Sequence, residues 1–210
     1  MEFEFVTAMN MEIWLRYGCR SLETWQHEPR IYWQEQEQDE KWLEFRSRPH
    51  PEEAQSFKRT CLRFSHKVEA QIHALRTSPA RYVIWLDADV VQTDRITDTE
   101  LEGLMPQDGD CLSYLGRGHN YHPETGFIAY DREHPKTREL ADLLEQVYLS
   151  GQVYTLPEWH DAFVWDHCCR QLSLPRWNLC RSPHQPGEAF GRSLLSRYYK
   201  HHKGERKNQI

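Results

Sequence analysis

The 210-residue sequence lacks the features that mark several large protein classes. Its six cysteines form no CxxC pair and no repeated spacing, which argues against a zinc ribbon and a disulfide framework. No apolar run approaches the roughly 18 residues of a membrane span, and the acidic start at residues 1–5 is too short for a signal peptide. A net charge of −6 disfavours general nucleic-acid binding. We therefore expect a cytoplasmic protein with reduced thiols, no membrane span and no nucleic-acid partner.

The hydrophobic pattern predicts an α/β protein with a mostly parallel sheet and flanking helices. Strands are expected at residues 3–8, 30–33, 82–86, 111–115 and 126–130, and helices at residues 11–25, 63–76, 137–148 and 161–172. Between these elements, residues 34–60 should form a loop with short helix, and residues 175–191 should be irregular. Strands alternate with helices over the first ninety residues, which is typical of a doubly wound sheet. No repeat or domain boundary is visible, so a single domain is expected over residues 1–210.

The most informative motif is Asp87-Ala88-Asp89, which follows the apolar run from Tyr82 to Leu86. Such a run is typical of a strand buried on both faces of a sheet. Open α/β sheets bind their ligands in the crevice outside the strand ends, where these two carboxylates should lie. Hard oxygen ligands suit Mg²⁺ or Mn²⁺, and such an ion usually shares its coordination with substrate phosphates. The motif therefore predicts an enzyme for a phosphate-bearing substrate.

Two enzyme classes place Asp-x-Asp after such a strand. The string from Asp87 to Val91 resembles the nucleophile motif of haloacid-dehalogenase-type phosphatases, in which Asp87 would be the nucleophile and Asp89 the acid/base. It also resembles the metal-binding motif of GT-A glycosyltransferases. About eighty residues with two βα units precede the motif, and we find no later Lys and acidic pair of the phosphatase kind. These observations favour the glycosyltransferase, with the phosphatase and a non-catalytic carbohydrate-binding protein of the same fold as alternatives.

The carboxyl end supports the same choice. His201, Gly204 and Lys207 form a His-x-x-Gly-x-x-Lys string, which resembles the terminal motif of the glycogenin-like and lipooligosaccharide galactosyltransferase family. The resemblance implies a GT-A fold and transfer from a nucleotide-sugar donor, with a UDP-sugar favoured, to a glycan, lipid-linked or protein acceptor. It implies that Asp87, Asp89 and His201 hold Mn²⁺ or Mg²⁺. It further implies that Gly204 and Lys207, with Arg206 as a third candidate, close over the diphosphate, so that residues 192–210 form a closing tail. The alternative for this basic end is a solvated tail.

Asp161 is the predicted catalytic residue, because it stands at the start of a predicted helix, where GT-A enzymes place a carboxylate near the reacting sugar. In an inverting enzyme it would be the general base, and in a retaining enzyme it would stabilise or orient the donor. The alternative is an ordinary helix N-cap.

Five further positions complete the predicted donor site. Thr7 and Ala8 end the first strand, where the nucleotide base should enter, and Arg63 and Lys67 open the helix before the metal strand. Gly126 would allow close approach of the backbone to the donor sugar. The alternatives are a solvated helix start for the basic pair and an ordinary turn for the glycine. His119, His122 and His160 could form a metal cluster, although dispersed histidines usually have no such role.

Overall fold

The computed structural model describes residues 2–36, 39–51, 56–118, 121–181 and 188–210. Its main sheet has six strands in the order β2-β1-β3-β6-β5-β7, and β4 and β8 form a separate two-stranded sheet. The strands are β1 (Phe3–Met9), β2 (Arg30–Trp33), β3 (Tyr82–Leu86), β4 (Val90–Gln92), β5 (Leu112–Leu115), β6 (Glu124–Asp131), β7 (Arg176–Asn178) and β8 (Tyr199–His201). The α-helices are α1 (Met11–Ile13), α2 (Cys19–Leu22), α3 (Glu40–Ser47), α4 (Leu62–Thr77), α5 (Asp98–Glu102), α6 (Pro135–Leu149) and α7 (Asp161–Gln171).

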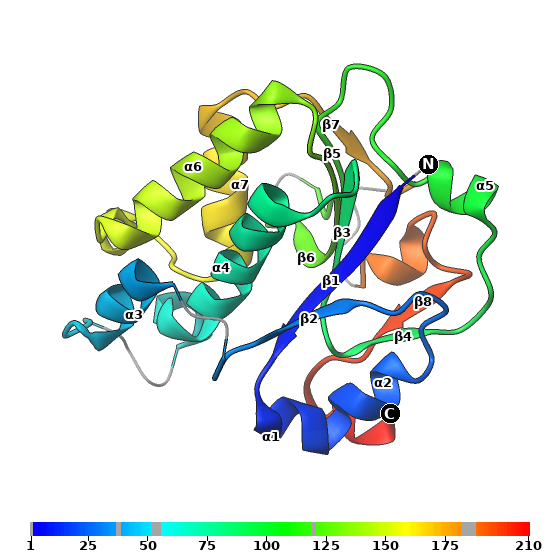
Figure 1. Cartoon of the computed structure of the whole chain (residues 1–210), viewed down its shortest axis with the longest axis horizontal. Helices are drawn as coiled ribbons and strands as arrows, with labels where there is room; N and C mark the ends of the chain where they lie inside the picture. Colours follow the sequence, from blue (N-terminus) through cyan, green and yellow to red (C-terminus); the bar gives the residue numbers. More distant parts are fainter. Residues whose placement is uncertain (1, 37–38, 52–55, 119–120, 182–187) are drawn as a thin grey trace.

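The sheet is mostly parallel, as predicted. β1 pairs in parallel with β2 and β3, and β5 pairs in parallel with β7, whereas β6 runs antiparallel between β3 and β5. Figure 1 shows α3, α4, α6 and α7 gathered on one side of the sheet, with the β4–β8 pair, α2 and α5 on the other. The predicted α/β fold with flanking helices is therefore confirmed.

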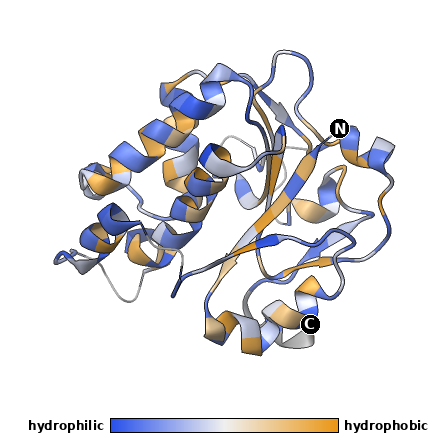
Figure 2. Ribbon diagram, in the orientation of Figure 1, coloured by the Kyte–Doolittle hydropathy of each residue, from blue (hydrophilic) through white to orange (hydrophobic). Residues whose placement is uncertain are grey.

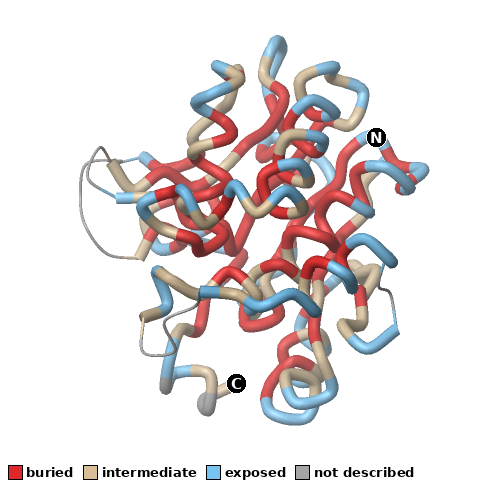
Figure 3. The backbone as a smooth tube through the Cα atoms, turned by 90° about the vertical axis from the view of Figure 1, so that its left-hand side faces the viewer, coloured by how far each residue is buried: buried red, intermediate tan, exposed pale blue. Residues whose placement is uncertain are grey.

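Burial on both faces of the sheet explains the apolar run of β3. All five residues of this strand are buried. Val83 and Trp85 pack into the core beneath the helices, while Ile84 and Leu86 pack into the core on the opposite face. This alternation is the period of two expected of a strand between two apolar layers. Figure 2 shows the central strands mainly hydrophobic, and Figure 3 shows the buried residues concentrated in the same strands.

The structure corrects two sequence-based expectations about the chain. The predicted helix over residues 11–25 ends at Leu22 and contains a π-helical turn at Trp14–Gly18 between α1 and α2. The segment 175–191, expected to be irregular, contains β7, which lies at the edge of the sheet beside β5. Residues 182–187 of that segment lie outside the described residues. A strand of three residues has too few positions to show an alternating pattern, so its pairing with β5 was not visible in the sequence.

All six cysteines are unpaired. No helix in the described part of the chain has both the length and the hydrophobicity needed to cross a bilayer.

Candidate functional site

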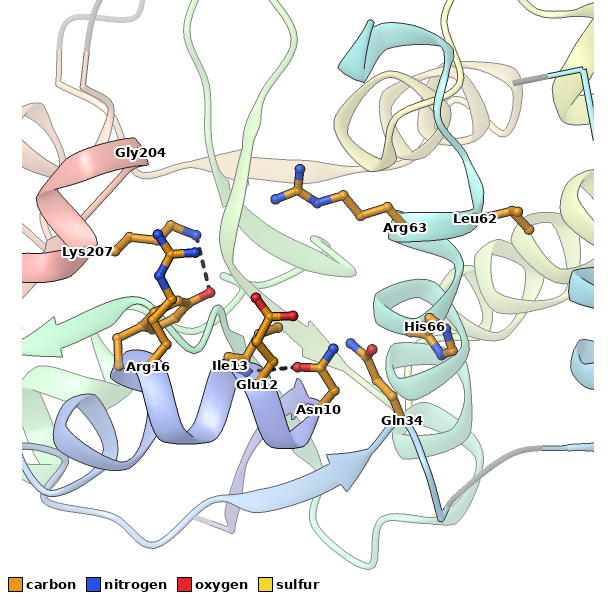
Figure 4. Close-up of a pocket in the computed structure, with 11 residues that line it drawn as sticks. Asn10, Glu12, Ile13, Arg16, Gln34, Leu62, Arg63, His66, Gly204 and Lys207 are labelled. Carbon is orange, nitrogen blue, oxygen red and sulfur yellow. Dashed lines mark hydrogen bonds between the residues drawn. The ribbon is translucent and has the colours of Figure 1, made fainter. Parts of the chain in front are cut away.

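A cleft lies at the edge of the main sheet where β1 and β3 end and β6 begins. It consists of two adjoining cavities of about 770 Å³ and 340 Å³. Both cavities are lined by Ile13, Tyr17, Gln34, Arg63, Gly204 and Lys207. Figure 4 shows the larger cavity, with the chain after β1 on one side, the start of α4 on the other and the carboxyl-terminal segment above. The smaller cavity contains the carboxylates of the Asp-x-Asp motif.

The end of β3 fixes the first carboxylate, Asp87. Its backbone N–H donates to the carbonyl oxygen of Gly126 on β6 (3.0 Å), which continues the β3–β6 pairing by one residue. Its Oδ1 accepts a hydrogen bond from the indole N–H of Trp85 (2.8 Å) and lies 2.7 Å from the Lys67 ammonium. Asp87 is therefore held at the cleft while its other oxygen, Oδ2, faces His201 at 4.0 Å.

The small β4–β8 sheet brings the second carboxylate to the terminal histidine. Val90 of β4 is paired with His201 of β8, and the His202 N–H donates to the Asp89 carbonyl oxygen. The Asp89 Oδ1 lies 2.8 Å from His201 Nε2, and its Oδ2 lies 2.6 Å from the Lys207 ammonium. Burial alone would raise the pKa of Asp89, but His201 and Lys207 outweigh it and hold that pKa well below the usual range. Asp89 is thus ionised and buried beside two residues of the terminal motif.

Glu124 joins this centre, although neither sequence motif includes it. It is buried at the start of β6, and its Oε1 lies 3.6 Å from His201 Nδ1. Arg117 and Lys203 contact its other oxygen. Asp87, Glu124 and His201 each offer one ligand atom, and the three atoms lie within 4.8 Å of one another. Two carboxylates and one imidazole are a suitable donor set for Mn²⁺ or Mg²⁺, and Asp89 adds a third carboxylate beside them.

Basic side chains contact every carboxylate of the centre. Lys67 contacts Asp87, Lys207 contacts Asp89, and Lys203 contacts Glu124. Burial is the main cause that lowers the pKa of Lys203 to about 8, and the charge of Arg117 adds to it. A divalent cation at this centre would therefore compete with ammonium groups for the same oxygens.

Gly126 is required by its contact with His201. A Cβ at this position would lie 2.8 Å from His201 Cε1 and 3.0 Å from its Nδ1, with Phe190 at 3.2 Å on another side. The β6 backbone therefore supports the imidazole ring, which is buried and packs against the Phe190 ring. This contact explains why position 126 needs a glycine, independently of the predicted approach of the backbone to a donor sugar.

We expect Gly126→Ala to displace His201 and to weaken Mn²⁺ binding about tenfold. The added methyl group has to move a buried ring, and overpacking of this kind costs about 1–3 kcal/mol of folding free energy. Mn²⁺ affinity measured by electron paramagnetic resonance and the melting temperature give the two readouts. Gly191→Ala is the matched control, because a Cβ at Gly191 meets no atom within 4 Å. Equal Mn²⁺ affinity in both variants would contradict the supporting role of Gly126.

Lys67 links the Asp-x-Asp motif to Asp161. Its ammonium lies 2.8 Å from Asp161 Oδ2 and donates to the Thr125 carbonyl oxygen (2.9 Å), in addition to its contact with Asp87. Burial alone would lower the pKa of Lys67, but Asp161 and Asp87 together raise it. In the same way, the charge of Lys67 overcomes burial and lowers the pKa of Asp161 to about 2. Both groups are therefore charged, and they form one ionic network in which the two side chains are only 13% and 12% exposed.

Asp161 is not the N-cap of α7, which was the alternative to a functional role. His160 occupies the N-cap position, and Asp161 is the first helical residue. The Asp161 Oδ2 accepts a hydrogen bond from the Thr125 hydroxyl (2.7 Å), so its side chain points into the smaller cavity that it lines. The Asp161 carboxylate thus contacts Lys67 and Thr125 and does not cap the helix that it begins.

The carboxyl-terminal segment reaches the cleft through Gly204 and Lys207. Gly204 has a φ of +58°, in the left-handed region that favours glycine. Lys207 also lies 3.3 Å from the Tyr17 hydroxyl and over the Tyr17 ring. The Arg206 guanidinium instead lies 3.4 Å from the Glu188 carboxylate. The segment is packed against the domain through β8, so the alternative of a wholly solvated tail does not hold.

The remaining predicted donor residues differ in their access to the cleft. Arg63 is exposed and lines both cavities, and Ala8 lines the smaller one. Thr7 is fully buried and is not among the described residues that line either cavity. Any contact of β1 with a ligand in the cleft would therefore come from Ala8 and the residues that follow it.

Comparison with solved structures identifies the fold. No protein-family model matches the chain, and no curated protein matches its sequence. A glycosyltransferase involved in glycosylation of the major capsid of PBCV-1 superposes with a TM-score of 0.59 at 14% identity, over 100% of this chain and 98% of that one. The galactosyltransferase LgtC gives 0.56 at 12% identity, over 96% and 87%. Mouse xyloside xylosyltransferase 1 gives 0.51 at 7% identity, over 86% of each chain. At these identities the likeness concerns the fold alone, and that fold is the GT-A fold of glycosyltransferases.

Proposed function

We propose that this protein is a metal-dependent glycosyltransferase that uses a nucleotide-diphosphate sugar, with a UDP-sugar favoured. The observation that carries the proposal is the contact between Asp89 and His201, 2.8 Å apart and separated by 112 positions in the sequence. Two motifs at distant places in the chain therefore meet at one edge of a GT-A sheet. The phosphatase alternative is not favoured, because the solved structures compared above are glycosyltransferases. The cytoplasmic location expected from the sequence stays a prediction.

In the proposed site, Asp87, Asp89 and His201 hold Mn²⁺ or Mg²⁺, with Glu124 as a further ligand or as the partner that orients His201. Bound there, the metal would supply a Lewis acid for the charge that grows on the leaving diphosphate. Lys207 would contact the diphosphate as a compact positive charge, and Gly204 would let the backbone of the 192–210 segment approach it. The segment would then close the cleft and exclude water that hydrolyses the donor.

Asp161 and Lys67 would position the donor sugar beside the metal. A carboxylate whose pKa is lowered to about 2 is a weak proton acceptor, so ion pairing with Lys67 disfavours Asp161 as a general base. Its lasting negative charge suits the other predicted role, in which it stabilises or orients the donor. The larger cavity, lined by Arg63 and His66 of α4, has the volume for the nucleoside. Of the two predicted β1 residues, Ala8 would contact the donor in the smaller cavity, whereas the buried Thr7 would support the end of β1 without touching the donor.

A thermal-melt screen tests this proposal. UDP, GDP, CDP and their sugars are each added with Mn²⁺ and with EDTA. A ligand at a hundred times its dissociation constant adds about 2.7 kcal/mol of stability. For a domain of this size we expect a rise of roughly 5–10 °C in melting temperature, with uridine nucleotides and Mn²⁺ only.

Two outcomes would count against the proposal. The metal–diphosphate site would be contradicted if no nucleotide raised the melting temperature, or if the rise persisted in EDTA. Slow release of nucleoside diphosphate from the donor that binds separates an enzyme from a non-catalytic carbohydrate-binding protein. A donor that binds with metal but never releases its diphosphate would favour the latter.

A further inference from the structure

A second group of metal-ligating side chains lies apart from the Asp87–His201 centre. His122, Glu158 and His160 each offer one ligand atom, and the three atoms lie within 4.8 Å of one another. His122 belongs to the segment between β5 and β6, while the other two residues precede α7. His160 also lines the smaller cavity of the cleft. His119, the third histidine of the predicted metal cluster, lies outside the described residues.

The three ligand atoms meet at the Glu158 carboxylate. His160 has extended backbone angles, with φ −75° and ψ 158°. Its side chain contacts that of Glu158, while Trp159 between them is buried in the core. The Nε2 atoms of His160 and His122 both face one oxygen, Glu158 Oε2, at 2.8 Å and 3.5 Å. Three potential ligands thus converge on one point.

The surroundings restrict the two imidazoles. The Phe163 ring lies 4.9 Å from the His122 ring, and the Phe57 ring lies 5.4 Å from the His160 ring. The second ring nitrogen of His160, Nδ1, lies 4.0 Å from Asp161 Oδ1. The two aromatic rings limit how the imidazoles can turn, and the Asp161 carboxylate lies close to Nδ1 but beyond hydrogen-bond distance; metal sites often place such a carboxylate behind a ligating histidine.

We propose that His122, Glu158 and His160 form a second metal site, for a divalent transition metal of the Zn²⁺ class. Ligands about 2.0–2.1 Å from a tetrahedral Zn²⁺ lie about 3.3–3.4 Å from each other. The His122–Glu158 distance of 3.5 Å is close to this value, and the 2.8 Å hydrogen bond between His160 and Glu158 would have to open by about 0.5 Å to admit the ion. Two imidazoles favour Zn²⁺ over Mg²⁺ and Mn²⁺, in contrast to the carboxylate-rich first centre. Three protein ligands leave the fourth position for water or a substrate group. The ion would tie the segment before β6 to the start of α7, beside Asp161.

Lys58 is expected to lower the affinity of the proposed site for Zn²⁺. Its ammonium lies 2.7 Å from Glu158 Oε1, so it competes for the carboxylate but leaves Oε2 to the two histidines. Removal of Lys58 should therefore tighten Zn²⁺ binding, whereas loss of a ligand should weaken it. Opposite effects from two neighbours of the same carboxylate distinguish a metal site from a merely structural cluster.

The test uses Asp87→Asn/Asp89→Asn as the background, which removes two ligands of the first centre without changing side-chain size. Circular dichroism confirms that each variant is folded. Zn²⁺ titration against a chromophoric chelator is expected to show one bound equivalent in this background. Adding His122→Ala or Glu158→Gln should weaken the affinity by at least about 100-fold, and adding Lys58→Ala should strengthen it. Co²⁺ should give the intense visible absorption of a tetrahedral site, which disappears with His122→Ala.

An exposed histidine provides the control. His73 on α4 is exposed and contacts Tyr32, so His73→Ala should leave Zn²⁺ affinity unchanged. The proposal is overturned if the background variant binds no stoichiometric Zn²⁺, or if His122→Ala and Glu158→Gln bind it as tightly as His73→Ala does. Because the readout is metal content without nucleotide, its failure leaves the proposed glycosyltransferase function untouched.

Discussion

Asp89→Ala is expected to abolish the metal-dependent melting shift with nucleotide and to lower donor turnover at least about 1,000-fold. Asp89 is buried, contacts His201 Nε2 at 2.8 Å and is the partner of Lys207. Its loss removes one proposed metal ligand. It also leaves His201 and Lys207 without the carboxylate that both of them contact. A bound metal contributes several kcal/mol to stabilising a leaving diphosphate, and each 1.36 kcal/mol is a factor of ten in rate. Melting curves with nucleotide and Mn²⁺, and the rate of nucleotide release, measure the two effects.

Asp94→Ala is the matched control for this loss. Asp94 is another aspartate close in sequence, but it is exposed and pairs with Arg197, whose side chain is also exposed. Surface pairs of this kind contribute at most about 1 kcal/mol. The control should therefore keep the nucleotide shift and the turnover of the unchanged protein. A nucleotide shift of normal size in Asp89→Ala would refute the proposed diphosphate site.

The sequence was sufficient to predict the sheet and its main helices because these elements bury long stretches of chain. β3 shows an unbroken apolar run, and α6 carries its apolar residues at helical spacing. The pattern of apolar residues therefore shows which side chains of these elements are buried. β4, β7 and β8 have only three residues each, too few for a periodic signal. Their pairing depends on tertiary contacts, and β4 with β8 is the pair that brings His201 to Asp89.

The candidate site was predictable where a motif pointed to it, but its ionic network was not. The two motifs supplied Asp87, Asp89 and His201, which the structure brings together. Glu124 belongs to the same segment as Gly126, yet a single glutamate before a strand carries no signal of its own. Lys67 joins Asp87 to Asp161 because α4 and α7 lie close together in the folded chain. The sequence alone does not give that distance.

Lys67→Met is expected to destabilise the protein by about 3–5 kcal/mol at pH 7, because it leaves two carboxylates beside each other without their shared cation. For a domain of this size the melting temperature should fall by roughly 10 °C or more. Lys136→Met is the control, since Lys136 pairs with Glu139 on the exposed side of α6 and should contribute less than about 1 kcal/mol. Urea unfolding in EDTA measures both variants without any contribution from a bound metal.

The pH dependence should identify Asp161 as the source of this loss. With Lys67 present, the pKa of Asp161 is lowered from 3.8 to about 2, so its stabilising contribution is present above about pH 4 and lost as the pH falls toward 2. Without Lys67, burial and the neighbouring Asp87 should raise that pKa above its unfolded value. The destabilisation should then be smaller at pH 4 than at pH 7, because it grows as the pH rises and Asp161 ionises without a partner. Adding Asp161→Asn to Lys67→Met should restore stability at pH 7. The contradicting outcome is a destabilisation by Lys67→Met that is equal at pH 4 and pH 7. It would mean that the effect comes from lost packing of the Lys67 side chain and not from unpaired charge.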